Sequence, residues 1–328
     1  MKFRILILAT VVASTIFSSC GTEDVTLMGN WVGKAFLEGR PRGEGTSFAI
    51  NDFGYFGMGK DDDGYLTDFW KYDPAKDAWS QVADFPGTPR AYNISVSNGK
   101  KGFVGLGYDG DNDLADFWEY DAAGNSWKQI KDFEGGARRY AAAFAIGSDI
   151  YVGTGLAEDG TIYTNDFYKF DGANWSKTTT LSGEKRRNAN AIGFNGKGYI
   201  ISGYHNYSLA DFWEYDPTTQ IWTKLTSLTD EDYGSTEIPR WNAATFVAND
   251  KIFLVGGTTG STLTTIFEWD PTTITWTQKT GIEYGNGREG VGSFVLNGNG
   301  YIVGGHSGAS YFDYCTMFQP DAEKDTDD

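Results

Sequence analysis

Apolar and polar positions alternate in short runs along most of this 328-residue chain, and the runs recur at a nearly fixed interval. Six tryptophans mark the interval, standing 48, 48, 48, 47 and 54 residues apart: Trp31, Trp79, Trp127, Trp175, Trp222 and Trp276. Six arginines keep the same interval: Arg42, Arg90, Arg138, Arg186, Arg240 and Arg288. A glycine follows each arginine by 17 residues: Gly59, Gly107, Gly155, Gly203, Gly257 and Gly305. A unit repeated at constant spacing indicates a repeat array.

Each repeat predicts four short strands. Between each glycine and the next tryptophan lies an aromatic run, clearest at residues 69–72, 117–120 and 212–215, which ends in aspartate. Short aromatic runs bounded by Asp, Pro and Gly are typical of strands. In the repeat that begins at Arg186, the strands are expected at residues 189–194, 198–201 and 212–215, and from Trp222 onward. Four antiparallel strands in about 45 to 50 residues match one blade of a propeller, because a blade buries both faces against its neighbours.

These repeats resemble the kelch family of β-propellers over about residues 31–320, since arginine, glycine, aromatic strand and tryptophan recur in that order. The resemblance implies an all-β, six-bladed kelch propeller that forms a single domain. The family usually carries a glycine pair, which is complete here only at 256–257 and 304–305. Elsewhere the first position is Met58, Leu106, Thr154 or Ser202. We therefore expect the second glycine to be the one that the backbone needs, for a positive φ or close packing.

The two ends of the array predict how the ring closes. The last repeat has its arginine, its glycine and a degenerate third strand at 315–320, but no tryptophan follows. The 11-residue step from Trp31 to Arg42 matches the steps in the next three repeats. We therefore expect the N-terminal strand to complete the sixth blade, which leaves no unpaired blade edge between the termini. The repeat arginines are expected to hold neighbouring loops through a backbone or carboxylate contact.

The N-terminal residues predict export. Lys2 and Arg4 precede a 13-residue apolar run that is too short to span a bilayer, which indicates a signal peptide over residues 1–19. Ser18-Ser19-Cys20 resembles the lipobox of bacterial lipoproteins, which implies that Cys20 is acylated. Residues 20–30 would then be a lipid-anchored tether at the cell envelope, in the outer membrane or on the cell surface. The alternative is cleavage elsewhere, with Cys20 left free.

Composition narrows the partners and the chemistry. The formal net charge of −17 argues against nucleic-acid binding, and residues 321–328 form an acidic tail. Galactose oxidase is also a kelch propeller, but its copper site needs a histidine pair and a cysteine-linked tyrosine. This chain has two histidines, His205 and His306, and Cys315 occupies a strand position expected in the core. The Asp109, Asp111 and Asp113 spacing lacks the glycine and glutamate of a calcium loop. We expect no metal and no cofactor.

Antiparallel order brings the second-to-third and fourth-to-first loops of every repeat to one face. These loops vary most, and they include the insertion at 230–239 that produces the 54-residue interval. Two positions in each repeat are expected to point to the mouth of the central channel on this face. Those after the arginines are Gly43, Ala91, Arg139, Arg187, Trp241 and Glu289; those after the glycines are Lys60, Tyr108, Leu156, Tyr204, Thr258 and His306. In kelch domains that this chain resembles, such positions contact ligands.

The mixture of side chains at this face suggests the ligand class. The candidate ligand-binding residues are Arg139, Arg187, Tyr108, Tyr204, His205, Trp241, Glu289 and His306. Guanidinium groups pair with carboxylates, and aromatic faces stack on apolar patches of sugars. A glycan, an acidic small molecule or a protein is therefore the expected partner. The structural alternative is that Arg139 and Arg187 simply pair with surface acids.

Two classes of function remain open. A non-catalytic binding module is preferred, because nothing resembles a nucleophile triad or a metal cluster. The alternative comes from resemblance, since six-bladed kelch propellers include exported sialic acid mutarotases, also called N-acetylneuraminate epimerases. That reaction needs an acid-base group, for which Glu289, Glu237 or His306 are candidates, and a carboxylate-binding arginine, for which Arg139 or Arg187 are candidates. The sequence does not identify the ligand or the oligomeric state.

Overall fold

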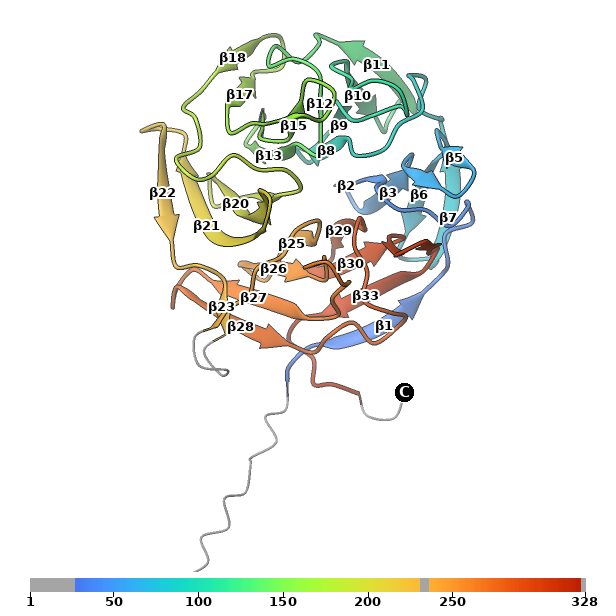
Figure 1. The fold of residues 1–328 in the computed structure, drawn as a ribbon. Helices are drawn as coiled ribbons and strands as arrows, with labels where there is room; N and C mark the ends of the chain where they lie inside the picture. Colours follow the sequence, from blue (N-terminus) through green and yellow to red (C-terminus); the bar gives the residue numbers. More distant parts are fainter. Residues whose placement is uncertain (1–26, 231–235, 326–328) are drawn as a thin grey trace, which may run out of the picture.

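The computed structural model describes residues 27–230 and 236–325, shown as a ribbon in Figure 1. The expected signal peptide, Cys20 and residues 326–328 of the tail lie outside the described residues. The described residues form strands joined by turns, and they include no helix that is long and apolar enough to cross a membrane. The expectation of an all-β fold is therefore confirmed.

The described strands include six four-stranded antiparallel sheets set around a common centre (Figure 1). The first three sheets comprise β2 (Thr46–Ile50), β3 (Phe53–Gly57), β6 (Phe69–Asp73) and β7 (Ala78–Val82); β8 (Ile94–Ser97), β9 (Gly102–Gly105), β10 (Phe117–Asp121) and β11 (Ser126–Ile130); and β13 (Ala142–Ile146), β14 (Asp149–Gly153), β17 (Phe167–Phe170) and β18 (Trp175–Lys177). The other three comprise β19 (Asn190–Phe194), β20 (Lys197–Tyr204), β21 (Ser208–Asp216) and β22 (Ile221–Leu225); β25 (Ala244–Ala248), β26 (Lys251–Val255), β27 (Ile266–Asp270) and β28 (Thr275–Lys279); and β29 (Gly292–Leu296), β30 (Asn299–Val303), β33 (Cys315–Gln319) and β1 (Asn30–Lys34). Each sheet places its first strand toward the centre and its tryptophan strand at the rim.

Shorter strands lie in the loops that connect the strands of these sheets. They are β4 (Lys60–Asp61), β5 (Gly64–Tyr65), β12 (Arg138–Arg139), β15 (Leu156–Ala157), β16 (Ile162–Tyr163), β23 (Thr229–Asp230), β24 (Thr236–Glu237), β31 (His306–Ser307) and β32 (Ser310–Tyr311). Most are two-residue arms of hairpins in the second-to-third loops, the loops that vary most between repeats. The pair β23 and β24 belongs to the insertion that lengthens one repeat, with β23 at its start.

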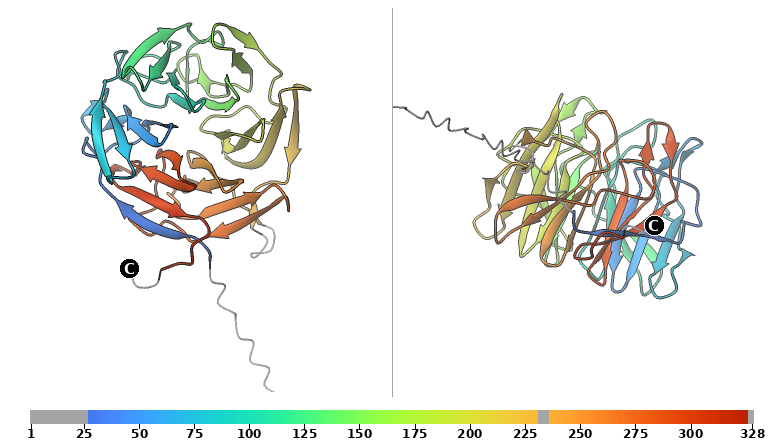
Figure 2. Two further views of the ribbon diagram at one scale, coloured as in Figure 1. Left: turned by 180° about the vertical axis from the view of Figure 1, so that it is seen from behind. Right: turned by 90° about the horizontal axis from the view of Figure 1, so that it is seen from below.

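The strand nearest the N-terminus pairs with the last strand of the chain. β1 and β33 are antiparallel, with Trp31 opposite Phe318, and their rings pack with centroids 5.0 Å apart. Both rings are fully buried. The indole of Trp31 also donates to the carbonyl of Thr280, which directly follows β28 of the neighbouring sheet. Two segments from opposite ends of the sequence therefore share one sheet, and Figure 2 shows them side by side from two directions.

The repeated tryptophans join each sheet to the one before it. Trp79, Trp127, Trp175 and Trp222 each donate their indole N–H to a backbone carbonyl 43 or 44 residues earlier, at 2.9 to 3.1 Å. All four carbonyls belong to residues one or two positions after the outermost strand of the preceding sheet. An indole pairs an apolar body with one polar hydrogen, so it can fill the space between two sheets and still satisfy its donor. Trp276 packs on Phe212 of the neighbouring sheet, but its Nε1 has no hydrogen-bond partner among the described residues. Packing between two sheets is therefore the task that explains the constant interval of tryptophan.

The repeated arginines are all buried, and four of them form bidentate ion pairs with an aspartate of the same repeat. These pairs are Arg42 with Asp68, Arg90 with Asp116, Arg138 with Asp166, and Arg186 with Asp211. Each arginine also donates to the carbonyl of the residue before its repeat glycine, at distances of 2.8 to 3.3 Å. Among the described side chains, no aspartate pairs with Arg240 or Arg288, and burial lowers the pKa of each to about 10.

The repeated glycines link the sheets into a circle. The N–H of each glycine donates to the carbonyl of the next repeat's arginine, from Gly59 to Arg90 onward, and Gly305 donates to Arg42 at 2.8 Å. Their φ angles lie between 78° and 117°, and a Cβ on Gly107 would stand 2.7 Å from the Ala91 carbonyl oxygen. The residue before each glycine is also left-handed, with φ from 55° to 65°. That narrower region is open to side chains, which is why Leu106 is tolerated there and the second position is glycine.

Candidate functional site

The two positions expected at the channel mouth face each other in every repeat. Each residue after an arginine pairs with the residue after the following glycine in a short antiparallel bridge. The pairs are Gly43 with Lys60, Ala91 with Tyr108, Arg139 with Leu156, Arg187 with Tyr204, Trp241 with Thr258, and Glu289 with His306. The twelve predicted positions therefore form six rungs, one from each repeat.

A ring of residues that the sequence reasoning missed lies one position further along. These residues, which we call the mouth ring, are Glu44, Tyr92, Tyr140, Asn188, Asn242 and Gly290, and all have φ between 50° and 60°. Their backbones are linked from repeat to repeat: the N–H of Tyr140 donates to Tyr92, Asn188 to Tyr140, Asn242 to Asn188, Gly290 to Asn242, and Glu44 to Gly290, at 2.8 to 3.2 Å. Their constant offset of two from each repeat arginine is the signal that could have identified them.

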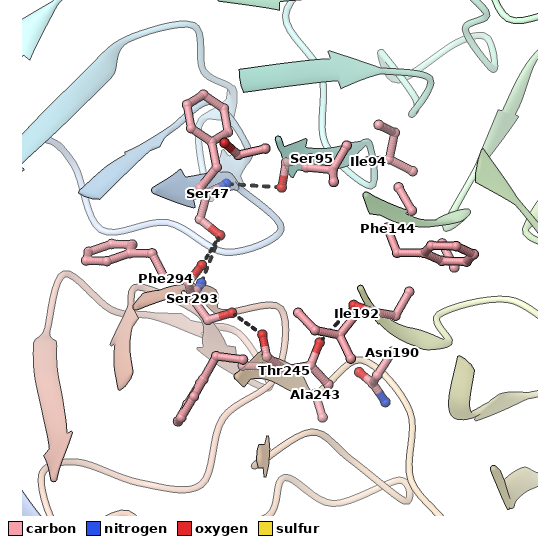
Figure 3. Close-up of a pocket in the computed structure, with 18 of the residues that line it drawn as sticks. Ser47, Ile94, Ser95, Phe144, Asn190, Ile192, Ala243, Thr245, Ser293 and Phe294 are labelled. Carbon is pink, nitrogen blue, oxygen red and sulfur yellow. Dashed lines mark hydrogen bonds between the residues drawn. The ribbon is translucent and has the colours of Figure 1, made fainter. Parts of the chain in front are cut away.

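Five mouth-ring residues, all except Gly290, line a cavity of about 500 Å³ that follows the innermost strands of all six sheets. Elsewhere in the cavity, hydroxyl groups form hydrogen bonds between the innermost strands of neighbouring sheets (Figure 3). Ser47 donates to the carbonyl of Ser293, Ser293 to that of Thr245, and Thr245 to that of Ala191, at 3.0 to 3.1 Å. These hydroxyl groups already have hydrogen-bond partners in the protein. The charged side chain that lines the cavity, Glu44, belongs to the mouth ring.

Arg187 stands out at the mouth because its guanidinium is surrounded by aromatic rings. Its central carbon lies 4.9 Å from the ring centroid of Tyr204, 5.1 Å from that of Tyr140 and 5.4 Å from that of Trp241. Its Nε is buried without a hydrogen-bond partner, and a terminal nitrogen makes a long 3.4 Å contact with Asn188. Among the described side chains, no carboxylate forms an ion pair with it. Its positive charge is therefore held in place but not neutralised.

Arg139 behaves differently. Its Nε lies 3.4 Å from a carboxylate oxygen of the buried Asp113, and it stacks on the ring of Tyr108 with a separation of 4.1 Å. It also donates to the carbonyl of Asp159. The alternative interpretation, that the mouth arginines pair with acids of the protein, therefore applies to Arg139 and not to Arg187.

Acidic and basic groups meet on the other side of the mouth. The Glu44 carboxylate accepts a hydrogen bond from the Asn242 amide at 2.7 Å and lies 3.2 Å from Nε2 of His306. The same amide donates to Glu289 at 3.2 Å. Burial raises the pKa of Glu289, and Glu44 contributes in the same direction. Burial alone would lower the pKa of His306, but the hydrogen bond and charge of Glu44, together with Glu289, raise it.

The raised His306 pKa predicts a pH-dependent stability. The contribution of the His306–Glu44 pair is fully present below the ordinary imidazole pKa of 6.5 and is lost as pH rises through the higher folded-state pKa. We therefore expect the denaturation midpoint of the protein to fall across this interval, and His306→Asn to remove that part of the fall. An unchanged profile in His306→Asn would contradict the assignment.

Other predicted residues lie elsewhere. Nδ1 of His205 is 3.2 Å from the Glu184 carboxylate, and its ring packs on Tyr163, so His205 contacts the outer hairpins rather than the Glu44 cluster. Glu237 is in β24, and its side chain lies outside the described part of the structure. Cys315 is buried in β33 within an apolar cluster.

The aspartates that were considered as calcium ligands take part in interactions within the protein's own loops. Asp109 accepts hydrogen bonds from the N–H groups of Asp111 and Asn112, and Asp113 pairs with Arg139. Across the described residues, no group of three or more His, Cys, Asp or Glu side chains is placed to hold a metal ion. These interactions give the carboxylates of Asp109 and Asp113 local structural roles.

Comparison with known proteins agrees with this architecture. The kelch motif matches residues 185–229 and 239–280. Among solved structures, the one titled "Structure of YjhT" is similar with a TM-score of 0.71 and 20% sequence identity, over 87% of this chain and 96% of that one. No curated protein matches the chain in sequence. The chain therefore carries kelch motifs and shares its fold with a solved structure, as the resemblance implied.

Proposed function

We propose that the protein binds an acidic ligand, such as a carboxylate-bearing sugar, at the channel mouth. The observation that carries this proposal is Arg187, a cation placed between three aromatic rings with no carboxylate partner among the described side chains. Arg187 is half-buried, and its Nε is enclosed without a hydrogen-bond partner. A partly desolvated cation gains free energy when an anion pairs with it. A site with an unpaired positive charge beside a cavity is suited to a ligand that supplies the negative charge.

The surrounding groups favour a sugar acid over a bare anion. Tyr204 and Trp241 pack edge to face, with centroids 5.6 Å apart, and both are only half-buried. Aromatic faces beside a guanidinium can stack on the apolar face of a sugar ring while the arginine holds its carboxylate. The amide of Asn188 offers a donor, and the amide oxygen of Asn242 an acceptor, for hydroxyl groups. The mouth therefore offers complementary contacts for each part of such a molecule.

Substitution of Arg187 tests this proposal. Arg187→Ala is expected to weaken binding of sugar acids by roughly 1 to 4 kcal/mol, the range of a desolvated arginine anchor, and to leave neutral sugars unaffected. The measurement is calorimetric titration against a panel of glycans and sialic acids. Arg139→Ala is the matched control, since Arg139 is already paired with Asp113. Equal losses for acidic and neutral sugars would instead indicate recognition by stacking and shape.

A mutarotase is the second candidate function, favoured by the acid-base groups of the same mouth. Glu289, with its raised pKa, and the His306–Glu44 pair would exchange protons with a sugar whose carboxylate is held by Arg187. Sialic acid has both the carboxylate that Arg187 would hold and the sugar ring whose anomeric exchange needs proton transfer. Anomeric exchange of N-acetylneuraminate can be followed by NMR with the wild-type protein and Glu289→Gln. Binding without acceleration of the exchange would leave the binding module as the function.

We also propose that the protein is exported and attached to the membrane by a lipid on Cys20. The support is the apolar run followed by Ser18-Ser19-Cys20. Cys20→Ala is expected to abolish acylation. Since the acyl chains on this residue would be what attaches the protein to the membrane, their loss should release the protein from the membrane fraction. Membrane fractionation and mass spectrometry of the N-terminal peptide measure both effects. Membrane association of the variant, with no lipid on the wild type, would contradict the proposal.

A further inference from the structure

The channel mouth separates charges of opposite sign instead of pairing them. Arg187 belongs to one rung, and Glu289 and the mouth-ring residue Glu44 come from repeats on the other side of the Trp241 rung. Among the described side chains, neither glutamate forms an ion pair with a lysine or arginine, and the imidazole of His306 is the base beside them. Two carboxylates therefore share one imidazole and one amide.

This arrangement contrasts with the rest of the molecule. Four repeat arginines are matched with aspartates, and Lys251 and Lys279 both contact the buried Glu268. At the mouth, by comparison, Glu44 and Glu289 lie close enough for the charge of one to raise the pKa of the other. Like charges held together cost free energy unless a cation joins them. The charges of His306 and Arg187 act on Glu289 in the opposite direction, but among the described side chains neither group forms an ion pair with it.

Both charge centres are within reach of one small molecule. Trp241 and Asn242 are consecutive residues: the Trp241 ring contacts the Arg187 guanidinium, and the Asn242 amide bonds both glutamates. The two centres are therefore connected through adjacent residues at the rim of the same cavity, which Asn242 and Glu44 line.

We propose that the mouth recognises a zwitterionic ligand, a sugar acid or related small molecule that carries a free ammonium group as well as a carboxylate. The carboxylate would pair with Arg187, and the ammonium would lie between Glu44 and Glu289, where it replaces the missing cation. This inference rests on the proposed function, because it assigns a second charged group to the same acidic ligand. Ion pairs at both ends would also fix the direction in which the ligand lies.

Matched ligands that differ only at the amine test the inference with the full-length protein. The pairs are muramic acid with N-acetylmuramic acid, and the methyl glycoside of neuraminic acid with its N-acetyl counterpart. Titrations are run at about pH 6.5, where amines of this kind are protonated. We expect the free-amine member of a pair to bind at least about tenfold more tightly. We also expect Glu289→Gln to reduce this preference, and Glu184→Gln, which alters an exposed acid beside His205, to leave it unchanged.

The outcomes separate the two proposals. If the N-acetyl member binds as tightly as the free amine in both pairs, the ammonium site is wrong and the acidic-ligand site stands. If the preference exists and persists in Glu289→Gln and in Glu44→Gln, the ammonium is bound elsewhere and the inference is again wrong. If no sugar acid of either type binds, or if binding is unaffected by Arg187→Ala, the proposed function itself fails.

Discussion

Deletion of residues 21–34, which removes β1, is expected to abolish cooperative folding or to lower the free energy of unfolding by more than about 5 kcal/mol. Truncation of a single buried tryptophan already costs about 3 to 5 kcal/mol, and this deletion removes a whole strand as well. The deletion removes Trp31 from its contact with Phe318 and leaves β33 as an unpaired edge. It also takes away the indole donor to the carbonyl of Thr280, which directly follows β28 of the neighbouring sheet. Chemical denaturation followed by tryptophan fluorescence measures the change.

The matched control is deletion of residues 21–26, which precede β1. This control is expected to unfold at the midpoint of the intact protein. A cooperative transition with an unchanged midpoint after loss of residues 21–34 would show that β1 is dispensable, and the pairing of β1 with β33 would then not be a main source of stability.

Arg186→Ala is expected to destabilise the protein by about 3 to 5 kcal/mol, the cost of removing one partner of a buried ion pair. The arginine donates to both carboxylate oxygens of Asp211 at 2.6 and 2.7 Å, and to the carbonyl of Ser202. Its loss leaves Asp211 with the Trp213 indole as its side-chain donor. The change is measured as the shift in denaturation midpoint multiplied by the slope of the transition.

The pH dependence of the same pair gives an independent test. Burial alone would raise the pKa of Asp211, but Arg186 holds it below its usual value of 3.8. A lowered folded-state pKa adds stability above the unfolded pKa, and this stability is lost as pH falls through the folded value. The acid-side loss should therefore shrink in Arg186→Ala. Arg240→Ala is the comparison, because Arg240 has no aspartate in the corresponding position and should not change this part of the profile.

The parts of the fold that the sequence predicted are those in which one residue type performs the same task in every repeat. Tryptophan recurs because each indole spans two sheets, and the second glycine recurs because a Cβ would meet backbone. The arginines recur even where the aspartate is absent, since the backbone carbonyl contact is common to all six. Such constraints produce a periodic pattern that can be read without any structure.

The site was less predictable because its residues share a position but not a chemical type. The six rungs were located from spacing alone, yet the mouth ring was overlooked, since glutamate, tyrosine, asparagine and glycine show no common pattern. The contact of Glu44 with His306 joins residues 262 positions apart, and it depends on the two ends of the chain meeting. The different partners of Arg139 and Arg187 depend on where the hairpin containing Asp113 lies, which spacing does not reveal.

The central claim is that the mouth recognises an acid through Arg187, and a crystal structure with the tightest-binding sugar acid tests it most directly. The account predicts a ligand carboxylate at about 2.7 to 2.9 Å from the Arg187 guanidinium, with the sugar ring against Trp241 or Tyr204. The mouth-ring residues Asn188 and Asn242 should lie beside its hydroxyl groups. A ligand bound on the opposite face, at the turns before the tryptophans, or one at the mouth that does not touch Arg187, would contradict the account.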